Sequence, residues 1–176
     1  MKKILILLLT IFGTVTFSEN VDIVIKNATV LTMDAKKTVI ENGVVAIKNN
    51  AIVEVGNREL LSKYKGKKTI DAENDIVMPG FINTHTHVSM VAFRSLADDI
   101  PDRLSRYIFP LENKLVSRDL VYKGAVYGIL EMVSTGTTTF ADMYYFEDEV
   151  AKAAELIGVR GVLGETVIKN PVADAK

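Results

Sequence analysis

The stretch Met78–His87, with the sequence MPGFINTHTH, decides how this chain is organised. A Pro-Gly turn introduces a short apolar run that ends in two histidines, and turns of this kind often separate elements of different type. Before the turn, short apolar runs alternate with a period of two; after it, strand and helix patterns follow each other. We therefore place a domain boundary between residues 78 and 79.

The part after the boundary reads as strand, helix, strand, helix, strand. The predicted elements are a strand over 81–87, a helix from the N-cap Ser117 to Gly136, a strand over 137–143, a helix over 148–157 that ends at Gly158, and a strand over 159–167. This order predicts a parallel α/β sheet with right-handed crossovers. Residues 79–176 are far fewer than the roughly 250 of a usual (β/α)8 barrel. The residues alone therefore leave open an incomplete barrel and a smaller open sheet.

The part before the boundary is predicted to be a small all-β unit. Short runs rich in β-branched residues are separated by turn residues, and they cover 21–25, 29–33, 44–47 and 51–55. Asn49-Asn50 is expected to form a hairpin turn, because asparagine tolerates positive φ. The polar stretch 59–68 carries a short helical pattern, and a strand returns at 69–71.

Composition excludes several classes of function. The formal net charge of −1 gives no electrostatic reason to expect a nucleic-acid partner. The sequence contains no cysteine, which excludes disulfides, thiolate ligands and a cysteine nucleophile. Any metal must therefore be bound by His, Asp or Glu.

Residues 1–18 are predicted to be a signal peptide. A cationic start is followed by an apolar run that is shorter than the roughly 20 residues needed to span a bilayer, and small residues precede Glu19. This pattern predicts export to the periplasm or the outside of the cell. The alternative is an uncleaved leader that anchors the protein in a membrane, and no other stretch is expected to enter one.

His85 and His87 are the candidate metal ligands. Residues i and i+2 of a strand point to the same face, so the two imidazoles should lie together at the carboxyl end of the first parallel strand. That end is where α/β barrels and open α/β sheets keep their active sites. Imidazole nitrogen is a common ligand of zinc and also suits iron. The alternative is a pair of core histidines that only make hydrogen bonds.

Other polar residues carry weaker signals. Asp142 ends the second strand, and we expect a supporting or packing role for it. Glu112, in the loop before a helix, reads from the residues alone as a solvated carboxylate. Arg94, Asp98 and Asp99 are expected to be surface residues or partners of helix ends.

Several motifs together carry a family resemblance. Residues 78–87 resemble the first-strand signature of the amidohydrolase superfamily. The segments 94–99, 110–112, 136–144 and 158–160 resemble its aminohydrolase branch, which includes 5-methylthioadenosine/S-adenosylhomocysteine deaminases and triazine chlorohydrolases. The resemblance covers about residues 21–170.

The resemblance implies a fold and a site. Residues 19–78 would form a β-sandwich segment, and residues 79–176 an incomplete TIM-barrel domain of about three βα units. One divalent metal, zinc or else iron, would be held by His85 and His87, and Glu112 would contact a purine nucleoside that undergoes hydrolytic deamination.

The resemblance also implies where the catalytic residues should be sought. The family's further metal ligands and its proton-shuttling glutamate come from later strands of the barrel and have no counterpart in this sequence. We therefore expect the catalytic residues beyond Lys176 and none within this chain. By itself the chain is expected to be inactive.

Two other functions remain open at this point. One is a cyclic-amide or dipeptide-like amidohydrolase with two metals. The other is an inactive, truncated binding module. The expected partner is a small-molecule substrate, without nucleic acid and without a membrane contact beyond the leader, and the chain is compatible with a homo-oligomer.

Overall fold

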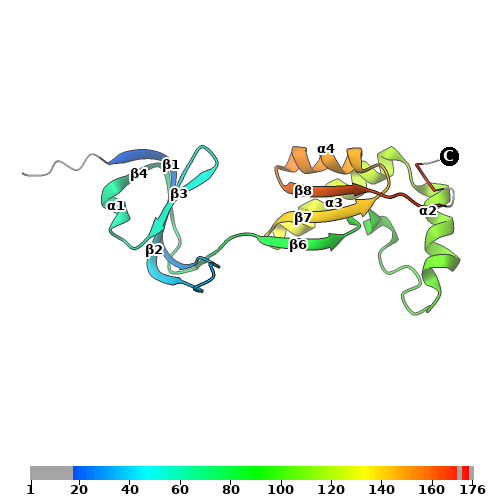
Figure 1. Ribbon diagram of the computed structural model, residues 1–176, viewed down its shortest axis with the longest axis horizontal. Helices are drawn as coiled ribbons and strands as arrows, with labels where there is room; N and C mark the ends of the chain where they lie inside the picture. The colour runs from blue at the N-terminus through cyan, green and yellow to red at the C-terminus, as the bar shows by residue number, and fades with distance from the viewer. Residues whose placement is uncertain (1–17, 170–171, 175–176) are drawn as a thin grey trace, which may run out of the picture. The chain divides into compact units, whose positions relative to one another are not determined.

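The computed structural model describes residues 18–169 and 172–174, and the chain divides into two compact units between Pro79 and Gly80 (Figure 1). Apart from Ser18, the predicted signal peptide lies outside the described residues. No described helix is both long enough and apolar enough to cross a membrane.

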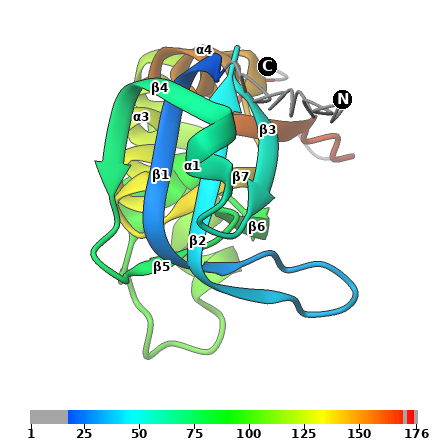
Figure 2. The same cartoon turned by 90° about the vertical axis from the view of Figure 1, so that its left-hand side faces the viewer.

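The first unit contains one five-stranded sheet with the order β3-β2-β1-β4, and β5 also pairs with β1. Its elements are β1 (Glu19–Leu31), β2 (Val39–Lys48), β3 (Ala51–Gly56), α1 (Leu60–Lys63), β4 (Tyr64–Asp71) and β5 (Ile76–Val77). Strands β1, β2 and β3 pair antiparallel, whereas β4 and β5 run parallel to β1. Figure 2 shows β1 between β2 and β4, with α1 across the sheet.

The hairpin prediction at Asn49-Asn50 is confirmed. The turn joins β2 to β3, and Lys48 pairs with Ala51 across it. Asn49 has a φ of 51° and Asn50 a φ of 63°. Two central residues with positive φ give a turn whose twist matches that of the flanking strands.

The prediction of two separate strands over 21–25 and 29–33 is wrong. Both belong to β1, which continues through Asn27 at a φ of 54° with a break in register after Ile25. The Asn27 amide donates to both carboxylate oxygens of Asp71, at 2.9 and 3.0 Å. The turn signal therefore marks a bulge within one strand, which the neighbouring strand holds in place.

The helical pattern expected over 59–68 is shorter in the structure. Helix α1 covers only Leu60–Lys63, and the chain enters β4 at Tyr64. Tyr64 is buried with Val21 and Val44, and Leu60 packs against this cluster. Residues 64–71 pair with β1 along one side, and this pairing outweighs a weak local helical preference.

The second unit is a parallel three-stranded sheet with the order β6-β7-β8, as predicted. Its elements are β6 (Phe81–Thr86), η1 (Val88–Phe93), η2 (Leu104–Ile108), α2 (Phe109–Leu115), α3 (Arg118–Ser134), β7 (Thr137–Tyr144), α4 (Glu147–Ile157) and β8 (Arg160–Glu165). Phe140 of β7 is buried with Ile129 of α3 and Val150 of α4. Helices α3 and α4 thus cover one face of the sheet (Figure 1).

The predicted helix ends are confirmed. Ser117 caps α3 by accepting a hydrogen bond from the Leu120 N–H at 3.3 Å, and Gly136 follows the helix with a φ of 90°. Gly158 ends α4 with a φ of 85°. Only glycine adopts these conformations at little cost, which explains why both helices stop where the sequence indicates.

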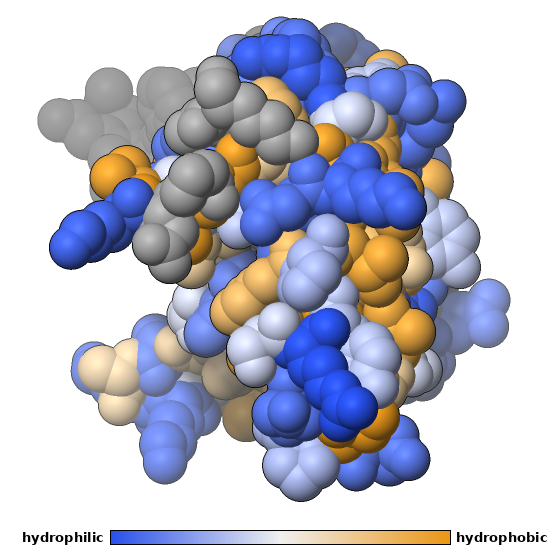
Figure 3. Space-filling view, turned by 90° about the vertical axis from the view of Figure 1, so that its right-hand side faces the viewer, coloured by the Kyte–Doolittle hydropathy of each residue, from blue (hydrophilic) through white to orange (hydrophobic). Residues whose placement is uncertain are grey.

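The opposite face of this sheet is apolar and exposed. Side chains alternate along a strand, so the neighbours of buried Phe140 and Asp142 point away from the helices. On that face Ile82 is 67% exposed and Val162 is 69% exposed, and Met143 is exposed as well. The end of the unit toward which the strands point shows apolar surface between hydrophilic side chains (Figure 3). Parallel sheets are normally covered on both faces.

Candidate metal centre

His85 and His87 lie together at the carboxyl end of β6. Their ring centroids are 5.2 Å apart and the ring planes are nearly perpendicular, at 86°. A zinc–nitrogen bond of about 2.0–2.1 Å puts each ring centroid about 3 Å from the ion. The separation therefore allows both imidazoles to bind the same ion.

A hydrogen bond from the next strand orients His87. Its Nδ1 lies 2.5 Å from the backbone oxygen of Met143 in β7. A carbonyl accepts only, so Nδ1 must carry the proton, and the lone pair of the neutral ring is then at Nε2. Metal-binding histidines commonly donate their second ring nitrogen to such an acceptor. The donor set and this tautomer fit a divalent metal.

The carboxylate of Asp142 holds the backbone around His87. Its Oδ1 accepts from Thr86 Oγ1 at 2.6 Å and from the Val88 N–H at 2.8 Å, which are the residues on either side of the histidine. Asp142 is buried on the helix side of β7. The supporting role expected from the sequence agrees with these contacts.

Two glycines of α3 allow the segment after His87 to pack against the helix. A Cβ at Gly124 would lie 2.5 Å from the Ser89 backbone oxygen, and one at Gly128 would lie 2.7 Å from the Val88 oxygen. Both are closer than side chains approach a backbone. The absence of side chains at these positions therefore lets η1 lie directly on α3, which fixes the chain beyond the histidine pair.

Glu112 is buried, not solvated as the residues alone suggested. It lies on α2, is 4% exposed, and its Oε1 accepts a hydrogen bond from the Tyr144 hydroxyl at 2.8 Å. Burial raises the pKa of the Glu112 carboxyl, while the hydroxyl bond and the nearby His87 lower it. The Tyr144 ring is 6.4 Å from that of His87. Tyr144 thus joins the glutamate to the neighbourhood of the histidines.

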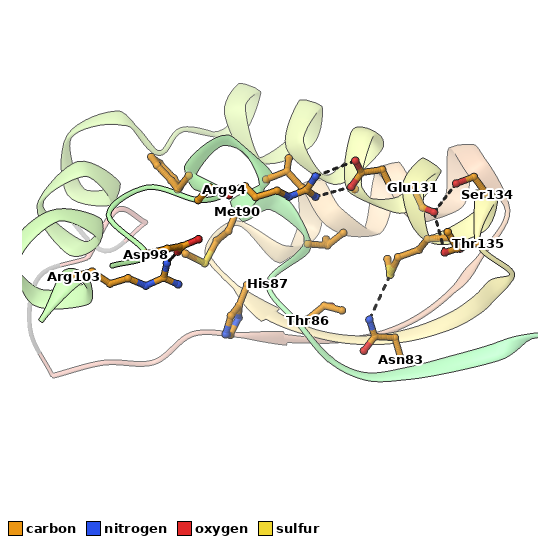
Figure 4. A pocket seen from close by; sticks show the side chains of 16 residues that line it. Asn83, Thr86, His87, Met90, Arg94, Asp98, Arg103, Glu131, Ser134 and Thr135 are labelled. Carbon is orange, nitrogen blue, oxygen red and sulfur yellow. Dashed lines mark hydrogen bonds and ion pairs between the residues drawn. The ribbon is translucent and has the colours of Figure 1, made fainter. Parts of the chain in front are cut away.

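A cavity of about 840 Å³ lies beside the histidine pair, lined by residues of β6, η1, α3 and the loop after η1. Arg94 pairs with Glu131 across it, and Asp98 pairs with Arg103. His87 points away from the Arg94–Glu131 pair (Figure 4). Arg94 and Asp98 are exposed, which agrees with the surface position expected from the sequence, and each is paired with an opposite charge.

The described residues offer two candidate ligands for one metal site, His85 and His87. Within 18–169 and 172–174, no group of three or more His, Asp or Glu side chains is arranged to hold an ion. Structural zinc sites use four protein ligands and catalytic ones about three. Two candidate ligands are therefore fewer than either kind of zinc site uses. Lys176 itself lies outside the described residues, and the expectation that the catalytic residues follow it stays a prediction.

Sequence reasoning missed Tyr144 and Glu147. Tyr144 gave no signal because a tyrosine at a strand end is ordinary, and its role follows from the approach of α2. Glu147 reads as a helix-start carboxylate, yet it is buried against Asp142. Glu165 of β8 accepts a hydrogen bond from the Glu147 N–H at 3.0 Å.

The chain is similar in sequence to several named deaminases. The chain is 43% identical over 161 residues to a 5-methylthioadenosine/S-adenosylhomocysteine deaminase of Syntrophus aciditrophicus, covering 90% of this chain and 36% of that protein. It is 45% identical over 150 residues to a 5'-deoxyadenosine deaminase of Methanosarcina barkeri, covering 84% and 34%. The chain spans little more than a third of these relatives.

A solved deaminase structure has a similar fold. An adenosine deaminase from Xanthomonas campestris with bound zinc superposes with a TM-score of 0.86 at 31% identity, over 90% of this chain and 37% of that one. The model of the amidohydrolase family matches residues 76–176, which include strands β6, β7 and β8 and both histidines. On this match, and on a fold shared with a zinc-containing deaminase, the chain belongs to the amidohydrolase family.

Proposed function

We propose that this chain provides the first metal-binding strand of a hydrolase that deaminates a purine nucleoside such as 5-methylthioadenosine or S-adenosylhomocysteine. The observation that carries the proposal is the histidine pair, with rings 5.2 Å apart and His87 Nδ1 bonded to a backbone carbonyl. The names of the relatives supply the substrate class.

His85 and His87 would hold one divalent metal, zinc in the first place. The chemistry that such a metal supplies when bound is activation of water for attack on a carbon that carries an amino group. The protein orients His87 through the Met143 carbonyl, and Asp142 fixes the backbone on both sides of it.

Glu112 would bind a donor group of the nucleoside. A buried carboxylate next to a metal site is suited to hydrogen-bond a hydroxyl or an amine of the substrate, and the Tyr144 hydroxyl holds one of its oxygens in place. With desolvation raising its pKa, this carboxyl retains a proton at higher pH than an exposed glutamate does.

The fold around this site would be completed as a TIM barrel. The exposed apolar face that carries Ile82, Met143 and Val162 supports this proposal, because an all-parallel sheet is otherwise stable only when both faces are covered. Strands β1 to β5 would belong to the accompanying β-sandwich.

Metal binding can be tested in the chain of 176 residues, because it has only two histidines. Zinc is titrated into ¹⁵N-labelled protein while the imidazole nitrogens are recorded. We expect both rings to respond at the same zinc concentration, with the larger change at Nε2 of His87, and His85→Asn to abolish the response of His87. Independent responses of the two rings would overturn a shared ion.

Activity is tested in the protein as its cells produce it. Ammonia release from 5-methylthioadenosine and S-adenosylhomocysteine is the assay, and Glu112→Gln is the diagnostic variant. Loss of a hydrogen bond to a charged group should lower kcat/KM by about 10- to 100-fold. The control is Lys114→Ala, at an exposed position of the same helix, which should retain activity. A protein that contains bound metal but releases ammonia from neither nucleoside would refute the substrate class.

Export through residues 1–18 forms part of the proposal. The support is the sequence pattern described above, and the test is the mass of the mature protein recovered from cells. An N-terminus at Glu19 is expected, whereas intact Met1 on the recovered protein would contradict cleavage.

A further inference from the structure

Two buried carboxyl groups face each other between β7 and the first turn of α4. Asp142 and Glu147 are each 5% exposed. Oδ1 of Asp142 accepts its two bonds from Thr86 and Val88. Its Oδ2 and both carboxyl oxygens of Glu147 are buried without a donor among the described residues. Two ionised carboxylates in this arrangement would be strongly unfavourable.

Among the described residues, the charges that act most strongly on Glu147 are carboxylates and not a cation. The charged groups that act on it most strongly are Asp142 from β7 and Glu165 from β8, and Glu165 in turn faces Asp174. The nearest arginine of the packed helix α3, Arg118, is bonded to other carboxylates of α4, Asp148 and Glu149. A proton is therefore the simplest source of the missing donor.

The electrostatic environment agrees with this geometry. Burial, followed by the charge of Asp142, raises the pKa of Glu147 from 4.5 to about 8. At neutral pH the group then carries a proton, and a carboxylic acid can donate one hydrogen bond.

We propose that Asp142 and Glu147 share one proton, with Glu147 donating to Asp142, and that this pair positions the backbone on either side of His87. Asp142 then keeps its charge-assisted bonds to Thr86 and Val88 while its second oxygen is satisfied. Glu147 is a positioning residue that acts through Asp142. The use of His87 as a metal ligand rests on the function proposed above, whereas the shared proton does not.

The pair predicts a particular dependence of stability on pH. Between about pH 4.5 and pH 8 the folded state retains the Glu147 proton and the unfolded state loses it. The folded state then binds more protons, so stability falls as pH rises through this window and levels off above it. Glutamine donates a hydrogen bond at every pH, so Glu147→Gln removes the part of this slope that Glu147 contributes.

The experiment compares urea unfolding of wild type and Glu147→Gln from pH 4.5 to 9. The variant should match wild type at the acid end and have a smaller unfolding constant at pH 9. The ceiling of this difference is about three thousandfold, set by the rise from 4.5 to about 8. Glu149→Gln is the matched control, because Glu149 is paired with Lys152 and Arg118. This control should keep the wild-type slope and gain no stability.

Two site-specific measurements accompany the unfolding data. In wild type, the ¹³C carboxyl signal of Glu147 should titrate near pH 8, and hydrogen exchange at the Val88 amide should accelerate above that pH beyond the intrinsic rate. In Glu147→Gln, the Val88 amide should stay protected. Titration of Glu147 below pH 5, or a Glu147→Gln variant less stable than wild type at pH 9, would overturn the shared proton. If Glu147 titrates near pH 8 as predicted but the protein binds no zinc, only the metal site is refuted.

Discussion

Replacing Gly124 by alanine tests whether close packing of α3 on η1 holds the segment after His87. The added Cβ would lie 2.5 Å from the Ser89 backbone oxygen and 3.2 Å from the carbonyl carbon and Cα of the same residue. These are backbone atoms, so no side-chain rotation can relieve the contact, and η1 must move away from the helix.

The magnitude follows from two opposing effects. Overpacking typically costs about 1–3 kcal/mol, and alanine in place of glycine favours a helix by about 1 kcal/mol. With a rigid backbone as the neighbour we expect the upper part of this range, a net loss of about 1–2 kcal/mol in the free energy of unfolding. Because η1 begins at Val88, the imidazole signals of His85 and His87 should shift as well.

Urea unfolding followed by circular dichroism measures the stability, and ¹⁵N spectra report on the imidazoles. Gly164→Ala is the control, since its Cβ would meet only the Asp142 backbone oxygen at 3.7 Å, and its effect should stay within about 0.5 kcal/mol. If Gly124→Ala stabilises the chain by its helix propensity and leaves both imidazoles unchanged, the proposed packing is wrong.

Three further predictions concern single side chains. Ser117→Ala should cost about 1 kcal/mol of unfolding free energy in urea titrations by removing the N-cap of α3, and Ser117→Asp should restore most of it. Tyr144→Phe should raise the pKa of Glu112 further, as read from its ¹³C carboxyl titration, because burial remains while the hydroxyl bond that lowers this pKa is lost. Hydrogen bonds from the Asn27 amide and from the other donors around Asp71 lower the pKa of Asp71 to about 2. The stability that Asp71 contributes is therefore present above pH 3.8 and is lost as the pH falls toward 2. Asp71→Asn should remove that acid-side slope in unfolding experiments, and an unchanged slope would contradict the assignment.

Local sequence patterns determined most of the secondary structure. The Asn49-Asn50 turn, the Ser117 cap and the two glycines that end α3 and α4 act through the backbone preferences of single residues, which are legible without any tertiary information. The alternation of strands and helices after Pro79 likewise predicted a parallel sheet, because short crossovers of this kind leave few other arrangements.

The same signals failed where the partner strand decides the outcome. Asn27 looks like a turn between two strands, yet β4 supplies Asp71 as its partner and β1 continues through it. The polar stretch from Tyr64 looks helical, yet it is a strand because it pairs with β1 along its length. Local propensity amounts to tenths of a kcal/mol per residue, which tertiary pairing readily exceeds.

For the candidate site, the sequence determined the histidine pair and the tertiary structure determined the contacts that support it. Residues i and i+2 of a strand share a face, so the sequence predicted that the two histidines lie close together, and they do, although β6 ends at Thr86 and His87 directly follows it. The support of this pair comes from three contacts. His87 bonds to the Met143 carbonyl and Glu112 is buried against Tyr144, and these pairs are 56 and 32 positions apart in the sequence. Asp142 meets Glu147 across the turn from β7 to α4. Such contacts depend on how β6, α2 and α4 approach β7, and the free energy of burying each carboxyl group depends on that approach, which no local pattern encodes.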